Sequence, residues 1–119
     1  MESNEQLINE QMYKALESVA FLPFGYIVDQ WRWDAFAGRV NVSELNRHWW
    51  RLRLQYQGVS PPATRSERDL DAITKIHMTD DTPYARYFVA ALLKFMFHEA
   101  LCKAAGEIAI NDNLTTISA

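Results

Sequence analysis

The 119-residue sequence contains a single cysteine, Cys102, so the chain can form neither an internal disulfide nor a metal site built from several cysteines. Its net charge of -3 and its scattered lysines and arginines leave no basic field, which excludes nucleic acid as an expected partner. Only four glycines are present, and they form no glycine-rich phosphate loop. The composition therefore favours neither a disulfide-stapled scaffold nor a nucleic-acid-binding domain.

Long apolar runs are missing as well. The apolar stretch at residues 88–97 is interrupted by Lys94 and is much shorter than the roughly 20 residues that cross a bilayer. Residues 1–5 lack the basic and apolar regions of a secretory signal. We therefore expect no signal peptide and no transmembrane segment within this chain, and this expectation does not extend to a longer parent protein.

Strand alternation is absent too, and apolar residues recur at helical spacing instead. A capping box at Ser3 opens a first helix, which we expect Pro23 and Gly25 to interrupt. A second helix is expected over residues 26–37, with Gly38 as its C-cap. The pattern predicts an all-α fold class.

Two further helices are predicted beyond this point. Asn41 opens an amphipathic helix that runs to Gly58, and residues 59–81 are typical of a loop with one helical turn at most. Thr82 is expected to be the N-cap of the longest helix, which Gly106 ends.

Four residues near the start of this last helix form the candidate site. Lys75 and His77 are two apart, so in an extended segment their side chains leave the same face. Tyr84 and Tyr87 are three apart and share a face of a helix. Such residues define no motif by themselves, and solvated side chains with wetted hydroxyls are the simpler interpretation of the spacing alone.

Several short stretches add to this pattern, namely residues 31–33, 49–53, 74–77, 84–87 and 97–102. Together they resemble the C-terminal part of the angiotensin-converting enzyme family, the zinc-dependent peptidyl-dipeptidases. The resemblance implies a helical C-terminal segment of a large peptidase catalytic domain and peptide substrates with a free C-terminus. It also implies a partner surface in the missing N-terminal part of that domain.

We accordingly divide the chain into a helical segment at 1–106 and a divergent, disordered tail at 107–119. The resemblance further implies a location outside the cell or on a membrane-anchored ectodomain. Two Asn-x-Ser/Thr triplets, at Asn41 and Asn113, suit a glycoprotein, although Asn41 is equally well placed to cap a helix.

The resemblance also implies roles for the four candidate residues. Lys75 and Tyr84 match the positions that bind the substrate's terminal carboxylate, which suits a point charge and a phenolic donor. His77 matches a donor to a substrate carbonyl. Tyr87 matches the phenol that stabilises negative charge developing on the attacked carbonyl oxygen.

Five more positions match sites of the same family. Glu17 and Phe21 match residues that line the pocket for the terminal side chain. Trp49, Arg53 and Arg86 match chloride-binding positions; Trp49 and Arg53 are one helical turn apart, and both carry donors without acceptors. Arg86 lies between the two candidate tyrosines and is expected to face away from them.

The zinc motif of the family, His-Glu-x-x-His on a helix, does not occur in this sequence. Its nearest counterpart runs from His98 to Cys102, where we favour structural roles over a metal site. Zinc is therefore expected only in the full-length family, with no metal ligand in this chain, and the isolated chain is expected to be inactive. The alternative is a non-catalytic helical interaction module or a decayed pseudo-peptidase.

Overall fold

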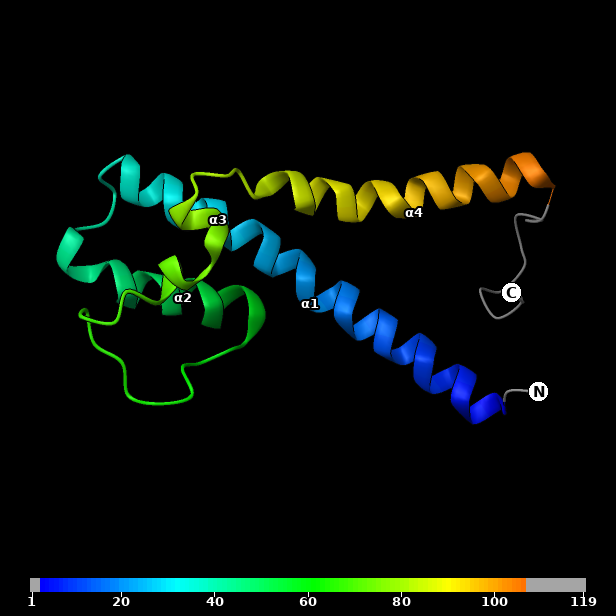
Figure 1. The fold of residues 1–119 in the computed structure, drawn as a ribbon, viewed down its shortest axis with the longest axis horizontal. Helices are drawn as coiled ribbons and strands as arrows, with labels where there is room; N and C mark the ends of the chain where they lie inside the picture. The colour runs from blue at the N-terminus through cyan, green and yellow to red at the C-terminus, as the bar shows by residue number, and fades with distance from the viewer. Residues whose placement is uncertain (1–2, 107–119) are drawn as a thin grey trace. The chain divides into compact units, whose positions relative to one another are not determined.

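The computed structural model describes residues 3–106, and the predicted tail at 107–119 lies outside the described residues. Every regular element in the described part is helical, which confirms the all-α prediction: α1 (Asn4–Phe36), η1 (Val42–Glu44), α2 (Leu45–Gln57), η2 (Asp71–Thr74), α3 (Ile76–Thr79) and α4 (Ala85–Ala105) (Figure 1). The chain divides into two units, Met1–Phe88 and Val89–Ala119. The candidate site belongs to the first.

The first helix, α1, is continuous, so the expectation that Pro23 and Gly25 interrupt it is wrong. A proline inside a helix removes one backbone hydrogen bond, but tertiary packing can outweigh that loss. Phe24 packs against the apolar core next to Pro23. A Cβ on Gly25 would lie 3.3 Å from the Cβ of Phe88, so this glycine permits a close approach between segments.

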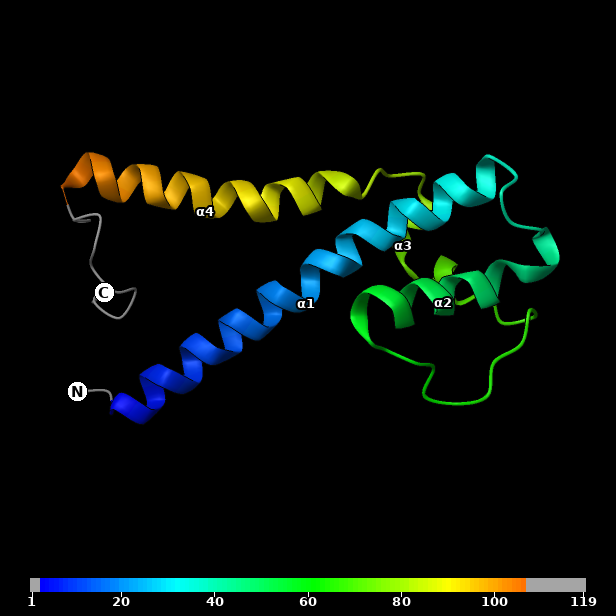
Figure 2. The same cartoon turned by 180° about the vertical axis from the view of Figure 1, so that it is seen from behind.

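The second helix, α2, packs antiparallel to the C-terminal half of α1, as both views show (Figures 1 and 2). The indole N–H of Trp31 donates to the backbone carbonyl of Leu45 at 2.9 Å. Further back along α1, the ring of Tyr26 contacts that of Tyr56, with centroids 5.1 Å apart. Aromatic side chains thus join these two helices.

The termini of α2 follow from capping chemistry. Asn41 caps the short η1 turn through its side chain, which accepts a hydrogen bond from the Ser43 N–H at 2.9 Å. Glu67, from the long loop, accepts from the N–H groups of Asn46 at 2.8 Å and Arg47 at 3.0 Å. Gly58 ends α2 with a φ of 67°, as predicted.

The core lies where α1, α2 and the segment at 70–84 meet. Its buried apolar side chains are Ile27, Val28, Trp31, Trp49, Leu52, Ala72 and Tyr84. Because Tyr84 is both a core residue and a candidate site residue, the site is anchored directly to the core.

The segment at 59–81 holds two short helical elements, η2 and α3, and not a single turn. The last helix, α4, begins at Ala85, and Gly106 follows its end with a φ of 75°. Within the described structure many large apolar side chains of α4 are exposed, among them Leu92 and Phe95. None of the described helices combines the length and apolarity that crossing a membrane requires.

Candidate functional site

His77, Tyr84 and Tyr87 form a compact aromatic cluster. The His77 ring centroid lies 4.8 Å from that of Tyr84 and 5.4 Å from that of Tyr87, and the two tyrosine rings are 4.9 Å apart. The Nε2 atom of His77 is 3.3 Å from the Tyr87 hydroxyl. The ammonium group of Lys75 lies 5.2 Å from the Tyr84 ring centroid and 5.7 Å from that of Phe24. The predicted convergence of these side chains is therefore present.

The local structure differs from the predicted extended segment. Lys75 has extended backbone angles (φ -79°, ψ 114°), but His77 lies in the single helical turn of α3. The alternation argument for a shared face is thus wrong at His77. Tertiary contacts turn its ring toward the two tyrosines instead.

The start of α4 depends on a residue that the sequence pattern did not single out. Asp29 on α1 accepts hydrogen bonds from the N–H groups of Tyr84 at 2.7 Å and Ala85 at 2.6 Å. The predicted N-cap, Thr82, instead contacts Asp80 through its hydroxyl at 3.4 Å. A buried carboxylate from another helix satisfies the first amide groups of α4 better than an exposed hydroxyl can.

The two residues expected to line the terminal side-chain pocket differ in their surroundings. The half-buried Phe21 brings its ring centroid to 6.2 Å from that of Tyr84, so it borders the cluster. Glu17, one turn earlier on α1, has an exposed side chain.

A cavity of about 400 Å³ lies between α2 and the segment before Lys75, and Arg53 and Lys75 both line it. The other lining residues are Phe24, Trp49, Trp50, Pro62, Ala63, Arg65, Asp71 and Thr74. The Arg53 guanidinium carbon lies 5.3 Å from the Phe24 ring centroid, 5.8 Å from that of Trp49 and 6.0 Å from that of Trp50. Burial lowers the pKa of Arg53 below its usual value. Its Nε is buried without a hydrogen-bond partner among the described residues. A buried donor without a protein partner is the kind of group that can bind a small ligand with a lone pair.

Arg86 was expected to face away from the candidate tyrosines, and this is wrong. Its guanidinium carbon lies 5.2 Å from the ring centroid of Tyr87. A long flexible side chain can fold back over the ring of its helical neighbour, where a cation–π contact is favourable.

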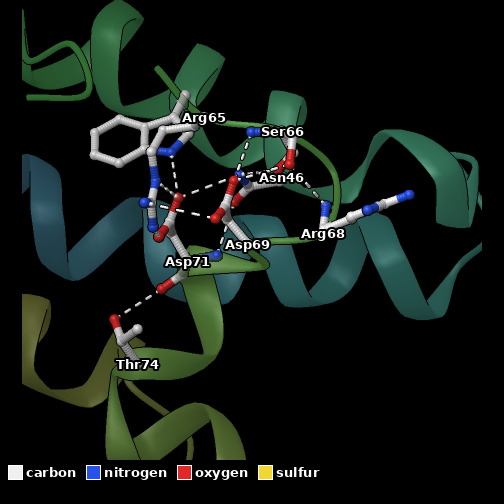
Figure 3. Close-up of polar contacts among 8 residues, drawn as sticks. Asn46, Arg65, Ser66, Arg68, Asp69, Asp71 and Thr74 are labelled. Atoms are coloured by element: carbon white, nitrogen blue, oxygen red, sulfur yellow. Dashed lines mark hydrogen bonds and ion pairs between the residues drawn. The ribbon is translucent and has the colours of Figure 1, made fainter. Parts of the chain in front are cut away.

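The turn before Lys75 is fixed by the carboxylate of Asp71 (Figure 3). Asp71 accepts from the side chains of Asn46 at 3.1 Å, Trp50 at 2.8 Å and Arg65, whose Nε lies at 2.9 Å. The hydrogen bond from Arg65 is the largest influence, and despite opposing burial the set holds the pKa of Asp71 well below its usual range. The Thr74 hydroxyl also donates to the Asp71 carbonyl at 2.7 Å. This network ties the site segment to α2.

Metal-binding chemistry does not fit the residues that the structure describes. Within residues 3–106 no three side chains of His, Cys, Asp or Glu gather as a metal site requires. His98 and Cys102 approach one another, with Sγ 3.7 Å from Nε2, but they are a pair and not a closed set of four ligands.

Comparison with known proteins identifies the family of this sequence. The family model described as angiotensin-converting enzyme matches residues 1–115. The angiotensin-converting enzyme of Theromyzon tessulatum is 57% identical over 98 residues, covering 82% of this chain and 16% of that protein. That of Bos taurus is 56% identical over 102 residues, covering 86% of this chain and 8% of that protein. The chain belongs to the angiotensin-converting enzyme family.

A third relative, the angiotensin-converting enzyme-like protein Ace3 of Mus musculus, is 43% identical over 107 residues, covering 90% of this chain and 14% of that protein. The chain thus spans only a small part of the length of each of these family members. The resemblance inferred from the short sequence stretches is confirmed.

The sequence analysis missed two residues of the site: Asp29, and Arg32, whose Nη2 donates to the His77 carbonyl at 2.7 Å. The sequence did contain a signal for them. Asp29 and Arg32 are three apart in an apolar, aromatic stretch of a helix, so both would be buried there, and buried charges need an ion-pair or hydrogen-bond partner.

Proposed function

We propose that this chain forms the substrate-binding part of a zinc metallopeptidase of the angiotensin-converting enzyme family, one that removes dipeptides from the C-terminus of peptides. The observation that carries this proposal is the convergence of Lys75, His77, Tyr84 and Tyr87 on one place in the first unit. A cation, an imidazole and two phenols together suit a carboxylate and a reacting carbonyl.

In this proposal Lys75 and Tyr84 hold the terminal carboxylate of the peptide. The ammonium group of Lys75 lies against the Tyr84 ring, so both can serve one ligand group. Tyr84 is buried in the core, which holds its ring still before substrate arrives. A preorganised donor loses little entropy when it binds its ligand.

Tyr87 and His77 act on the reacting end of the substrate. The hydroxyl of Tyr87 is 3.3 Å from Nε2 of His77, and Tyr87 as a residue is more exposed than Tyr84, so its side chain can turn toward a bound peptide. A phenol that donates to the carbonyl oxygen stabilises the transition state more than the substrate, because negative charge develops there. His77 donates to a neighbouring substrate carbonyl. Glu17 and Phe21 border the terminal side chain.

Chloride is the second proposed ligand. Trp49 and Arg53 would hold one ion, and the buried Nε of Arg53, which has no hydrogen-bond partner within residues 3–106, supports this. Arg86 would hold another, close to Tyr87. An ion at either place would adjust the position of the neighbouring substrate-binding side chains.

Zinc would supply the Lewis acid of the family reaction. The described residues do not fit it, and we assign no step of the reaction to a metal in this chain. We propose that the metal ligands lie in the N-terminal part of the catalytic domain and that the whole protein works outside the cell or on a membrane-anchored ectodomain.

A chimeric enzyme tests the proposal. The 102 residues of the Bos taurus protein that match this chain would be replaced by the corresponding residues here, and angiotensin-converting activity measured. We expect kcat/KM within about tenfold of the parent, a barrier change of about 1.4 kcal/mol. A chimera that melts like the parent but has no activity would overturn the proposal.

The second candidate function is a non-catalytic helical interaction module. Large exposed apolar side chains on the first half of α1 favour it: Leu7, Ile8, Met12, Tyr13, Leu16 and Val19. Surfaces of this kind mark protein contacts. An inactive but folded chimera, together with self-association of the isolated chain in sedimentation experiments, would support this function over the first.

A further inference from the structure

We propose that Arg32, acting with Asp29, is a positioning residue that sets the geometry of the His77, Tyr84 and Tyr87 cluster. This inference rests on the proposed function, because it assigns the pair a role in substrate binding. Both charged residues are buried on α1, with Asp29 2% and Arg32 6% exposed. Burying charges is costly unless they are paired and hydrogen-bonded, so their contacts show what they hold in place.

Arg32 holds the backbone of the segment that carries His77. Its Nη2 donates to the carbonyl of His77 at 2.7 Å and to that of Thr82 at 3.0 Å. His77 lies in α3, and Thr82 lies in the link between α3 and α4. One guanidinium group therefore bonds both α3 and the link that follows it, next to the hydrogen bond from the Thr82 N–H to the His77 carbonyl at 3.0 Å.

Asp29 holds the other end of the same segment. Its Oδ2 accepts from the N–H groups of Tyr84 and Ala85 at 2.7 and 2.6 Å. The Nη1 atom of Arg32 lies 3.7 Å from Asp29 Oδ1 and 3.8 Å from the carboxylate of Asp81. The two residues, three apart on α1, therefore act together. Asp29 accepts hydrogen bonds from backbone N–H groups of the site segment, and Arg32 donates to its backbone carbonyls.

The four shortest hydrogen bonds from this pair to the site segment are to backbone atoms, and this decides the kind of role. The pair sets where the backbone of His77 and Tyr84 lies, and this determines whether their rings meet at a centroid distance of 4.8 Å. The planar fork of an arginine can hold two carbonyls in fixed directions, whereas a lysine offers a point charge without that geometry. Arg32→Lys therefore keeps the charge and removes the positioning.

The test uses the full 119-residue chain in solution NMR, with three reporters. The indole N–H of Trp31, bonded to the Leu45 carbonyl, reports the packing of α1 on α2. The ring protons of His77 report the cluster through ring-current shifts. Amide hydrogen exchange at Tyr84 reports the hydrogen bond from its N–H to Asp29.

For Arg32→Lys we expect an unchanged Trp31 signal, His77 ring shifts that move toward those of an unstructured peptide, and exchange at Tyr84 faster by about tenfold or more. Asp29→Asn should act in the same direction and serves as the second variant. Arg39→Lys is the matched control. Arg39 lies beyond the end of α1 and forms an ion pair with Asp34, away from the site segment.

Unchanged His77 shifts and unchanged Tyr84 exchange in both variants would overturn the inference. So would loss of the Trp31 signal together with the cluster signals in both variants, because that result means a general stabilising role.

Titration with a tripeptide separates this inference from the proposed function. A free-acid tripeptide should shift the wild-type Tyr84 and His77 signals at lower concentration than its amide. In Arg32→Lys the ratio of the dissociation constants for amide and acid should fall by about tenfold. A wild-type chain that keeps its cluster signals but binds acid and amide equally would overturn the proposed carboxylate site. The cluster signals of the variants would still decide whether Arg32 positions the segment.

Discussion

The indole N–H of Trp50 donates a 2.8 Å hydrogen bond to the carboxylate of Asp71. This contact joins α2 to the turn that leads into Lys75. The same carboxylate accepts from Asn46 and Arg65, so three side chains from two segments meet on one charge (Figure 3). Asp71, together with Glu67, fixes the long loop to α2.

Asp71→Asn should destabilise the chain by about 2 kcal/mol, because hydrogen bonds to a charged acceptor are stronger than those to an amide and Arg65 loses its ion-pair partner. Urea unfolding followed by tryptophan fluorescence measures this. Asp69→Asn is the matched control, since Asp69 also pairs with Arg65 but is more exposed. Equal losses in the two variants would contradict the central role of Asp71.

Acid should weaken the same network. The pKa of folded Asp71 is depressed, chiefly by Arg65, so its contribution to stability is fully present above the unfolded aspartate pKa of about 4. Below that pH the unfolded chain binds a proton first, and the free energy of unfolding falls as pH falls. Urea unfolding between about pH 5 and pH 3 should show a steeper decline for wild type than for Asp71→Asn. Parallel curves would disprove the assignment.

Tyr87→Phe, made in the chimeric enzyme, should lower kcat by roughly 10²-fold with little change in KM, because only the hydroxyl that meets the developing charge is lost. Tyr26→Phe is the matched control: both tyrosines are 37% exposed, but Tyr26 contacts Tyr56 away from the cluster. If kcat is unchanged in Tyr87→Phe, the oxyanion role is wrong.

Lys75→Ala in the same enzyme should raise KM and leave kcat nearly unchanged, since a charge that holds the carboxylate does so in both ground and transition states. The effect should be smaller for a peptide with an amidated C-terminus. Lys14→Ala, in an exposed ion pair with Glu10, is the control. Equal losses for acid and amide peptides would argue against carboxylate binding.

The purified chain should hold no stoichiometric zinc. Among the described residues, His48 is engaged on both ring nitrogens, by Asp34 at 2.8 Å and Arg51 at 2.7 Å. His98 and Cys102 offer only a pair of ligands, and a closed site needs four. Elemental analysis after dialysis measures the metal. One zinc per chain that is lost in Cys102→Ser would show a site that we have not recognised.

Much of the fold could be predicted from local patterns. The Ser3 capping box is formed, and Gly58 and Gly106 lie at the ends of α2 and α4, because these features depend on neighbours within one helical turn. The prediction failed at Pro23, where a helix-breaking residue lies inside α1. Propensity is a weak local bias, and packing of the flanking aromatic residues overrides it.

The candidate site shows the same division. The residue types and their spacing were sufficient to select Lys75, His77, Tyr84 and Tyr87 and to indicate the family. Their roles in binding and catalysis stay predictions. The orientation of Arg86 and the backbone at His77 could not be predicted, because each depends on contacts between side chains and segments whose geometry the spacing does not determine.

The sequence by itself determined that the chain is helical, where α2 and α4 end, and which family it belongs to, since capping, periodicity and short motifs are local properties. Only the tertiary structure decided where α4 begins and how the site is assembled. The reason is the buried pair Asp29 and Arg32, which lies more than forty residues before His77 and Tyr84 and yet bonds their backbone. A buried charge must find partners, and the folded chain supplies them from a distant segment.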